Sequence, residues 1–499
     1  MKHYKAGITC FIAVLLTSLG LAQKIDTSPN RAKTSIKIDL PLIGSVTPRS
    51  TAEIEGSNWL IGCETMDRDF TDYDQYKEYI APLGIKLLRM QAGWAKTEKV
   101  KGQYDFAWLD HIVDDATSRG LKPWLQTSYG NKLYPGGGGD NLGAGMPTSE
   151  EALVGYNKWV AAMVTRYKDK VDNWEVWNEP NFGDNIINTP EMTAAFNIRT
   201  AEIIKRIQPR ARISGLSLGH YNYDFVDRFF KAIAKKKKMG LFDNMTYHDY
   251  VYNPDANYHE VYMIRTLLDK YGGSNVKLRQ GENGAPSEPG FGRGALGDYD
   301  WTELSQAKWD TRRMLGNLGH DVECSIFGLI EMAYTNGPIS RLNYKGIIKS
   351  DSTKRVIRPK MAYYSMQHVT SIFDNTLERI KNVTHTHNMN GAGPNEHRFS
   401  VGTDRSIAVY GYRNKATQKQ LYTVWMNETI PLNTNETKLL TMSFSNANFD
   451  SPVLVDIISG AVYEIPAGKW SKKGNTYTFK EMPVYDGPIV IADRSLIRF

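Results

Sequence analysis

The fold is decided by a repeated unit, and residues 122–177 contain one copy of it. The copy begins with the apolar run Lys122-Pro-Trp-Leu-Gln-Thr127, passes through a glycine-rich loop at Gly136–Gly139, and enters a helical stretch near Ser149-Glu-Glu151. It ends in a second apolar run, Asn173-Trp-Glu-Val-Trp177. Serine is a good N-cap, and acidic residues in the first turn interact favourably with the helix dipole. The stretch therefore predicts a strand, a helix and a second strand.

The same alternation recurs on both sides of this copy. The other apolar runs are Trp59–Cys63, Ile85–Met90, Arg212–Leu216, Asn244–His248, Val276–Gln280 and Val322–Leu329. The helical stretches between and after them are Asp72–Leu83, Trp108–Arg119, Met192–Ile207, Phe225–Lys236, Tyr258–Lys270 and Glu303–Leu318. Eight strand–helix alternations predict an α/β fold, a (β/α)8 or TIM barrel over residues 55–375. An open doubly wound sheet is the rival, but no G-x-G-x-x-G motif follows the first run.

The pattern changes after residue 375. Alternating segments at Ser406–Tyr412, Gln420–Met426, Lys438–Phe444, Pro452–Ile458 and Thr476–Phe479 are separated by turn residues, and no helical pattern recurs. This texture predicts a C-terminal all-β sandwich over residues 376–499 that buttresses the barrel or binds glycan. Residues 23–54 form a lead, whose alternating run at Thr34–Leu40 could pair with the sandwich.

Residues 1–22 have the pattern of a signal peptide. Lys2 and Lys5 precede an apolar stretch, and small residues stand before Gln23. We therefore expect export to the periplasm or the outside of the cell, without membrane insertion. That compartment permits a disulfide between Cys63 and Cys324, although two buried free thiols are the alternative.

Composition excludes some classes of function. With 41% hydrophobic and 23% charged residues, the chain is an ordinary globular protein rather than a disordered one. The net charge of +7 over 499 residues is weak, so no nucleic-acid partner is expected, and the basic run Lys235–Lys238 reads as a solvated helix end. No cysteine and histidine cluster has metal-ligand spacing. The oligomeric state is left open.

Two glutamates follow predicted barrel strands, where such barrels carry their chemistry. Asn178-Glu179-Pro180 follows the fourth run, and Gly281-Glu282-Asn283-Gly284 follows the seventh. A retaining glycosidase needs two such carboxyl groups, one to protonate the leaving oxygen and one to attack the anomeric carbon. Glu288 is a competing candidate for the second role.

The segment Trp174-Glu-Val-Trp-Asn-Glu-Pro-Asn181 resembles the acid/base motif of clan A of the glycoside hydrolases, and most of all family 39. Arg89, Gly102-Gln-Tyr-Asp105, His248-Asp-Tyr250 and Arg358–Tyr364 also fit this resemblance. It implies that Glu179 is the acid/base and Glu282 the nucleophile. It also implies a carbohydrate substrate and neither a metal nor an organic cofactor.

The supporting residues have chemical roles and structural alternatives. Asn178 is placed to bind a sugar 2-hydroxyl. Arg89 could keep the nucleophile ionised or form a structural ion pair, and His248 and Tyr250 could bond the nucleophile or a substrate hydroxyl. Glu331 could line the pocket or form a salt bridge. Four aromatic residues could stack on sugar or fill the core: Trp94, Tyr129, Trp301 and Tyr334.

These features favour a retaining β-glycoside hydrolase that acts on oligo- or polysaccharide through a covalent glycosyl–enzyme intermediate. Exo action is favoured, because insertions such as Tyr129–Met146 could wall off one end of the cleft. The alternatives are an endo-acting glycanase of the same clan, an inverting hydrolase, and a non-catalytic carbohydrate-binding protein on the same scaffold. The sugar and its linkage are not encoded by these motifs.

Overall fold

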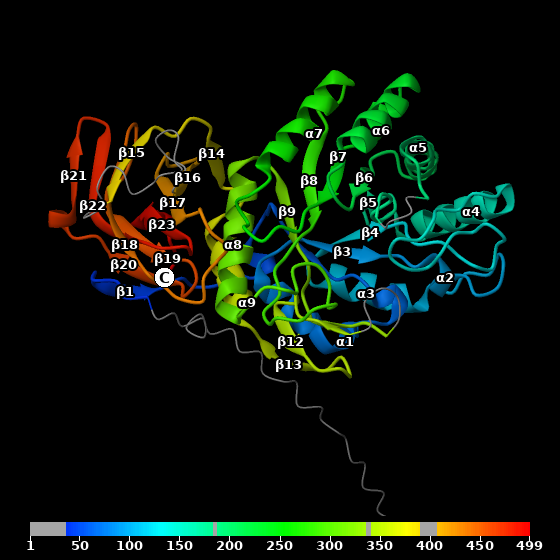
Figure 1. Cartoon of the computed structure of the whole chain (residues 1–499), viewed down its shortest axis with the longest axis horizontal. Coiled ribbons are helices and arrows are strands. Elements are labelled where there is room, and N and C mark those ends of the chain that lie inside the picture. The colour runs from blue at the N-terminus through cyan, green and yellow to red at the C-terminus, as the bar shows by residue number, and fades with distance from the viewer. Residues whose placement is uncertain (1–35, 183–186, 336–340, 390–406) are drawn as a thin grey trace, which may run out of the picture.

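The computed structural model describes residues 36–182, 187–335, 341–389 and 407–499. These residues form a closed barrel of eight parallel strands and, beside it, two larger antiparallel sheets. Figure 1 shows the barrel and the sheets side by side, with helix α8 (Glu303–Gly319) between them. The predicted leader lies outside the described residues. Among the helices in the described ranges, we find none with the length and apolarity needed to cross a bilayer.

The barrel strands lie in the eight predicted runs. They are β2 (Trp59–Gly62), β3 (Leu87–Gln91), β4 (Lys122–Gln126), β5 (Asn173–Glu175), β6 (Arg212–Leu218), β7 (Asn244–His248), β8 (Lys277–Glu282) and β9 (Glu323–Ile326). Each strand pairs in parallel with the next, and the pairing of β2 with β9 closes the barrel. The predicted TIM barrel is confirmed. Cys63 and Cys324 are buried free thiols, so the disulfide alternative is not realised.

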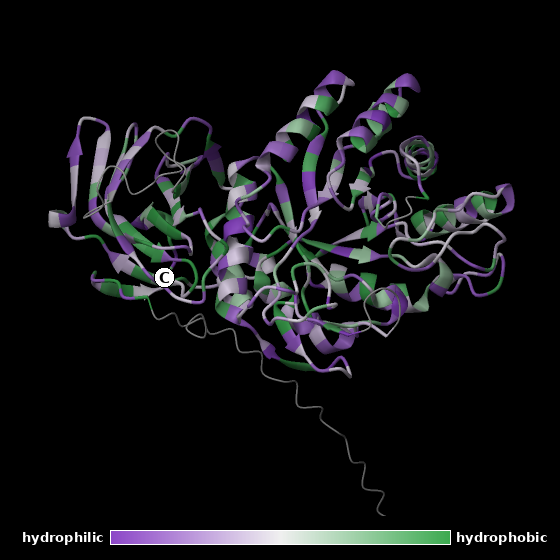
Figure 2. Cartoon of the chain, viewed as in Figure 1, coloured by the Kyte–Doolittle hydropathy of each residue, from purple (hydrophilic) through white to green (hydrophobic). Residues whose placement is uncertain are grey.

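Helices surround the barrel. They are α1 (Tyr73–Tyr76), α2 (Trp94–Thr97), α3 (Ala107–Ser118), α4 (Glu150–Tyr167), α5 (Pro190–Ile207), α6 (Tyr223–Lys235), α7 (Tyr258–Lys270), α8 and α9 (Met361–Ile372). Figure 2 shows hydrophobic and hydrophilic residues alternating along α6 and α7. In α6 the buried face consists of Phe225, Val226, Phe229, Phe230 and Ile233, at the spacing expected of an amphipathic helix.

One predicted helix is broken. The stretch Asp72–Leu83 forms α1 and then two separate 3-10 turns, Lys77–Tyr79 and Ala81–Leu83. Pro82 explains the second interruption, because proline lacks the backbone N–H that a helix interior needs and restricts the residue before it.

The C-terminal region is the predicted sandwich. The seven-stranded sheet has the order β1-β20-β19-β23-β17-β16-β14, and the four-stranded sheet has the order β15-β18-β22-β21. The strands are β1 (Leu42–Ser45), β14 (Leu377–Ile380), β15 (His385–Met389), β16 (Ile407–Asn414), β17 (Gln420–Met426), β18 (Lys438–Phe444), β19 (Pro452–Asp456), β20 (Ala461–Glu464), β21 (Trp470–Lys473), β22 (Thr476–Val484) and β23 (Ile489–Asp493).

Two further features complete the topology. The lead contributes β1, which pairs with β20, whereas the predicted run at Thr34–Leu40 holds no strand over its described residues 36–40. Two small hairpins follow β9: β10 (Met332–Ala333) with β11 (Leu342–Asn343), and β12 (Ile348–Ser350) with β13 (Val356–Pro359).

Helix α8 joins the barrel to the sandwich through buried charges. Lys308 donates to the backbone oxygens of Leu432 and Thr434 and pairs with Asp486 at 2.6 Å. Arg312 pairs with Asp255 of the barrel at 2.6 Å and donates to the Thr429 carbonyl of the sandwich at 3.1 Å. Because each buried cation has one carboxylate and backbone acceptors, the two parts of the chain are held in a fixed relation.

Candidate active site

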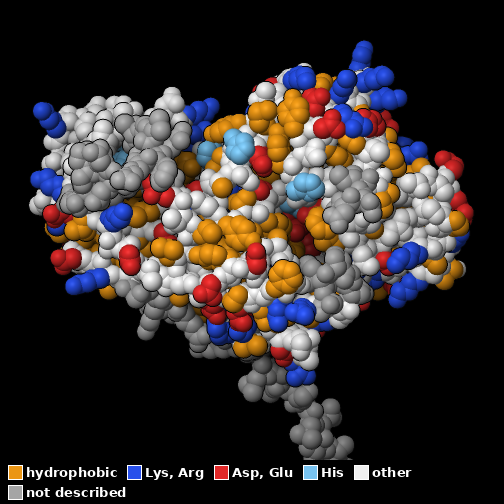
Figure 3. All heavy atoms as spheres, viewed as in Figure 1, with side chains coloured by type: hydrophobic (Ala, Val, Ile, Leu, Met, Phe, Trp, Pro, Cys, Tyr) orange, Lys and Arg blue, Asp and Glu red, His pale blue; other side chains and the backbone are white. Residues whose placement is uncertain are grey.

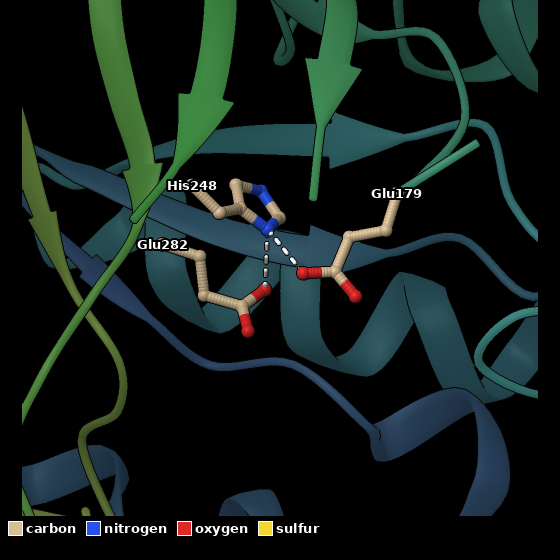
Figure 4. A group of neighbouring side chains, drawn as sticks. All are labelled: Glu179, His248 and Glu282. Atoms are coloured by element: carbon tan, nitrogen blue, oxygen red, sulfur yellow. Dashed lines mark hydrogen bonds and ion pairs between the residues drawn. The ribbon is translucent and has the colours of Figure 1, made fainter. Parts of the chain in front are cut away.

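The predicted catalytic pair lies at the carboxyl ends of the barrel strands. Glu282 is the last residue of β8, and Glu179 follows β5, which ends at Glu175. Figure 4 shows the two side chains pointing toward each other, with His248 from the end of β7 beside both. On this face of the molecule, Figure 3 shows a hollow near the centre with acidic side chains on its floor.

The backbone around Glu179 is strained. Trp177 and Glu179 both have positive φ angles, 65° and 48°, which cost an L-residue roughly 1–2 kcal/mol each. The Glu179 N–H donates to the Ser217 carbonyl at 2.9 Å and fixes the turn. A Cβ on Gly219 would lie 3.0 Å from the Glu179 side chain, so glycine leaves room for that side chain. Strain of this kind is typical of functional sites, where the surrounding fold imposes it.

The two carboxyl groups are close together. One oxygen of Glu179, one oxygen of Glu282 and a His248 ring nitrogen all lie within 4.8 Å of one another. In retaining glycosidases the carboxyl groups are about 5–5.5 Å apart, whereas inverting enzymes leave about 6.5–9.5 Å for a water molecule. At 4.8 Å or less, the distance between these two oxygens is below the range of the inverting class.

His248 connects the two carboxyls. Its Nδ1 lies 2.7 Å from Glu179 Oε1 and 3.6 Å from Glu282 Oε2. Burial acts to lower the pKa of His248, but the charge of Glu282 and the hydrogen bond with Glu179 outweigh burial and raise this pKa. The imidazole is therefore held where it can share a proton with the catalytic pair.

Arg89 lies at the centre of the site and is fully buried. Its Nη1 donates to Glu282 at 3.0 Å, its Nε to Glu175 at 2.8 Å, and its Nη2 to Asn178 Oδ1 at 2.9 Å. Both alternatives raised for this residue are thus present, because Arg89 contacts the predicted nucleophile and also forms a structural ion pair with Glu175.

Glu282 is surrounded by groups that favour its ionised form. Tyr250 donates its hydroxyl hydrogen to Glu282 Oε1 at 2.7 Å. Burial works to raise the pKa of Glu282, but the charges of His248 and Arg89 and the bond from Tyr250 are stronger together and hold the pKa below its ordinary value. A carboxylate kept ionised in this way is suited to act as a nucleophile.

Asn178 and Tyr129 lie beside the acid/base candidate. Asn178 Nδ2 donates to the Tyr129 hydroxyl at 2.7 Å, and its Oδ1 also accepts from Gln126 at 3.0 Å. These bonds fix the orientation of the Asn178 amide. The Tyr129 side chain is almost fully buried. The guanidinium of Arg68 lies over the Tyr129 ring, 5.0 Å from its centroid. Tyr129 is thus part of the wall of the site.

Two site residues have no assigned role in the sequence-based prediction. Glu64 follows β2 by two residues, and its Oε1 accepts from Arg89 Nη1 at 2.9 Å. Glu175 accepts from Arg89, Gln126, Ser217 and Thr246. The feature of the sequence that could have identified both residues is an acidic residue within, or directly after, an apolar strand run.

Two further side chains lie near Glu282 at the mouth of the barrel, the end at which the carboxyl ends of its strands meet. Tyr334 stands against Phe70, with ring centroids 4.9 Å apart, and its hydroxyl is close enough to Arg68 and Glu282 to feel their charges. Lys345 Nζ donates to the Ala295 carbonyl at 2.5 Å and lies 5.3 Å from the Tyr250 ring centroid. Burial lowers the pKa of Lys345 to about 7 against the opposing charge of Glu282.

Two aromatic residues predicted as pocket candidates lie elsewhere. Trp94 is in the core, where its ring stacks on Tyr134 at 5.2 Å and its indole donates to Glu98 at 2.5 Å. Trp301 belongs to a small separate cluster and donates to the Leu296 carbonyl at 2.6 Å. An aromatic residue after a strand can turn inward to the core as readily as toward the mouth of the barrel, and both residues take the core alternative.

The two alternative glutamates form ion pairs. Glu331 and Lys360 are both fully buried and lie 2.6 Å apart, so the salt-bridge alternative holds for Glu331. Glu288 is half-buried and pairs with Lys349 at 2.6 Å. Neither glutamate has a contact with Glu179 or Glu282 among the described residues.

Glu179, His248 and Glu282 also have the donor atoms of a small metal site. However, Arg89 lies 3.0 Å from Glu282 and 3.2 Å from His248 Nε2. A divalent cation in this position would face the guanidinium charge. The arrangement is better suited to moving protons between carboxyls than to holding a metal ion.

The loop after β4 walls one side of the site. Its backbone folds on itself through bonds from Gly130 to Gly139 and from Asn131 to Gly137. It also contacts the segment after β5, because Met146 N–H donates to Asn188 at 2.9 Å. The insertion Tyr129–Met146 is therefore an ordered wall and not an open arm.

Known proteins resemble this chain in part of its sequence. A family model described as beta-galactosidase (glycoside hydrolase family 42) matches residues 68–134, which include β3 and β4. A 6-phospho-beta-glucosidase from Clostridium longisporum is 26% identical over 183 residues, which are 34% of this chain and 34% of that protein. The chain spans about a third or less of the length of the curated relatives it matches.

Solved structures match nearly the whole fold. A family 39 glycoside hydrolase from the gut symbiont Bacteroides cellulosilyticus WH2 superposes with a TM-score of 0.59 at 17% identity, over 88% of this chain and 81% of that one. A monomeric beta-xylosidase from Caulobacter crescentus CB15 gives a TM-score of 0.57 at 15% identity, over 91% and 97%. The chain thus resembles glycoside hydrolases of clan A in fold and, over part of its length, in sequence.

Proposed function

We propose that this protein is a retaining β-glycosidase that cleaves oligo- or polysaccharide by double displacement. The observation that carries the proposal is the spacing of Glu179 and Glu282, whose nearest oxygens lie within 4.8 Å. The similarity to glycoside hydrolases supports the reaction class. The strained turn at Glu179 and the ionised state of Glu282 support the individual roles.

In the first half-reaction, an oxygen of the Glu282 carboxylate bonds to the anomeric carbon as the bond to the leaving oxygen breaks. Glu179 gives its proton to that leaving oxygen. Arg89 and Tyr250 hold Glu282 in its charged form and in a fixed orientation. The amide of Asn178 is held beside the pair for a sugar 2-hydroxyl, a contact that strengthens in the transition state.

In the second half-reaction, Glu179 removes a proton from water as the water attacks the anomeric carbon. The ester bond to Glu282 breaks, and the nucleophile leaves as a carboxylate. His248, at 2.7 Å from Glu179, stabilises the charge that Glu179 carries in the covalent intermediate. The two inversions give a product with the starting anomeric configuration.

The finer properties belong to the same proposal. The ordered wall Tyr129–Met146 supports exo action on chain ends or short oligosaccharides. Export follows from the signal-like residues 1–22. Among similar proteins, one is described as a 6-phospho-beta-glucosidase and another as a beta-xylosidase. Aryl β-glucosides, their 6-phosphates and aryl β-xylosides are therefore the first substrates to screen.

The test removes the nucleophile and supplies a small one in its place. Glu282→Gly should abolish hydrolysis of the best aryl glycoside, and added azide should restore turnover and give the α-glycosyl azide. Glu179→Ala with azide should give the β-glycosyl azide instead. Glu288→Gln is the matched control, because this half-buried glutamate pairs with Lys349 and should keep wild-type activity.

Each other outcome contradicts part of the proposal. Full activity of Glu282→Gly would remove Glu282 from the reaction. An inverted product from the wild type would favour the inverting mechanism. Binding of oligosaccharide without hydrolysis of any aryl glycoside would favour the non-catalytic carbohydrate-binding protein.

A further inference from the structure

The catalytic centre contains more carboxyl groups than the two that the reaction uses. Glu64, Glu175, Glu179 and Glu282 are all buried, and each contacts Arg89 or His248. Arg89 and His248 are the cations that contact these carboxyls, and Lys345 is a further cation near Glu282. Even with all three charged, the cations are fewer than the carboxyls, and because an unbalanced buried charge is costly, at least one carboxyl must hold a proton in the resting state.

The four carboxyls differ in the number of hydrogen-bond donors that face them. Glu175 accepts four hydrogen bonds, and Glu282 accepts from both Arg89 and Tyr250. An ionised carboxylate is stabilised by such donors. Among the described residues, His248 is the one hydrogen-bond partner of the Glu179 carboxyl, and Arg89 is the one side chain that donates to Glu64. Of the two carboxyls with few donors, Glu179 is the proposed proton donor of the reaction, so Glu64 is the carboxyl left to hold the excess proton.

Glu64 differs from Glu179 in its surroundings. No described residue bonds its Oε2, and this atom lies over the α-carbon of Gly62, where a Cβ would be only 2.2 Å away. Its Oε1 shares Nη1 of Arg89 with Glu282, at 2.9 and 3.0 Å. An ionised Glu64 would therefore compete with the nucleophile for the same N–H group.

The groups that face Glu64 come from several elements. They are the Arg89 guanidinium, the Glu282 carboxylate, the Cys63 thiol and the phenols of Tyr76 and Tyr334. Burial raises the pKa of the thiol and of both phenols, so they stay neutral at physiological pH. Burial and the nearby Glu282 together outweigh Arg89 and raise the pKa of Glu64 to about 7.

We propose that Glu64 is a proton-holding positioning residue of the catalytic centre. In the resting enzyme it is a neutral carboxylic acid that accepts from Arg89 and leaves the charge of Arg89 to Glu282. This inference rests on the proposed function for its meaning, since it explains how Glu282 stays ionised in a site with excess acid. The protonation state itself can be measured without a substrate.

The direct test is infrared spectroscopy of the free protein. The carbonyl stretch of a protonated carboxyl is separate from carboxylate bands and shifts when glutamate is labelled with ¹³C. The wild type at pH 6 should show such a band that is absent in Glu64→Gln and disappears as the pH rises through about 7. Asp456→Asn, a buried carboxyl of the sandwich, is the matched control and should keep the band. Absence of any Glu64-dependent band at pH 6 would overturn the proposal.

The kinetic test asks whether a neutral group is sufficient. Glu64→Gln keeps an oxygen for Arg89 and mimics the neutral acid, so kcat at pH 6 and the acid limb of kcat/KM should match the wild type. Glu64→Ala removes that acceptor, and kcat should fall about tenfold or more with little change in KM. A shift of the acid limb to lower pH in Glu64→Gln would mean that Glu64 is ionised together with Glu282, against the proposal. If infrared supports the neutral acid but no glycoside is cleaved, the proposed activity fails and the protonation of Glu64 does not.

Discussion

Two regions of this molecule bury charged side chains, and they differ in how the charges are balanced. Where α8 meets the sandwich, Lys308 pairs with Asp486 and Arg312 with Asp255, and backbone carbonyls accept further N–H groups. At the barrel mouth, Arg89 and His248 face four carboxyls. At α8 each cation has a carboxylate partner, and the contacts join two parts of the chain. At the mouth of the barrel the carboxyls outnumber the cations that contact them, so this region has to hold and move protons. Buried charge by itself does not mark a reactive site, but excess buried acid does.

The largest expected effect is at the mouth. Glu179→Gln removes the proton donor without changing the shape of the side chain, so kcat/KM for a poor leaving group should fall by about 10²–10⁴-fold. An aryl glycoside with an acidic phenol needs less protonation and should lose less. Steady-state kinetics on the two substrates would check this, with Glu288→Gln as the control. Equal losses on both substrates would argue against an acid role for Glu179.

The next effect is at the junction and should change stability instead of rate. Asp255→Asn leaves Arg312 buried without its charge partner, which should cost about 3–5 kcal/mol of unfolding free energy. Denaturant unfolding would measure the loss, and kcat of the folded fraction should stay at the wild-type value. Glu151→Gln, in an exposed pair with Lys101, should change stability by no more than about 1 kcal/mol. A large drop in kcat for Asp255→Asn would contradict the view that the buried charges at α8 are structural and those at the mouth are catalytic.

A smaller effect concerns pH. Tyr250 donates to Glu282 and helps hold its pKa below the ordinary value. Tyr250→Phe should therefore raise the pKa of Glu282 and move the acid limb of kcat/KM to higher pH, by about one unit. Tyr247→Phe is the matched control, because Tyr247 lies on β7, three residues before Tyr250, and its buried hydroxyl has no hydrogen-bond partner among the described residues. An acid limb that stays in place in Tyr250→Phe would contradict the role given to this bond.

The smallest kinetic effect is expected at a residue outside both regions. Trp301 packs in its own cluster and bonds the Leu296 carbonyl. Trp301→Phe should lose about 0.5–1.5 kcal/mol of stability with the indole bond and leave KM unchanged. Thermal unfolding and KM for the best substrate would check this. A KM raised several-fold would return Trp301 to the binding site.

The sequence predicts the barrel well because each strand is a short apolar run that can be recognised from its own residues and immediate neighbours. The helix over Asp72–Leu83 is the exception, since Pro82 and tertiary packing divide it. Glu179 and Glu282 could be placed at one mouth because parallel strands of a barrel present their carboxyl ends on the same side. Neither inference requires knowledge of side-chain direction.

The rest of the site depends on contacts between distant segments. Glu64 and Glu282 share the guanidinium of Arg89, although most of the barrel sequence lies between them. The closure of the barrel brings such distant residues together. It therefore decides how many hydrogen-bond donors face each carboxyl and how well the charged form of that carboxyl is stabilised. For Trp94 and Trp301 the choice between core and pocket could not be made from the sequence, because an aromatic residue after a strand gives no sign of which way its ring turns.

The central claim is that Glu282 attacks the anomeric carbon and that the product retains its configuration. Proton NMR of the first minutes of hydrolysis of the best aryl β-glycoside tests it most directly, before the free sugar mutarotates. The account predicts that the β-anomer forms first and then converts to the equilibrium mixture. Initial appearance of the α-anomer would contradict it.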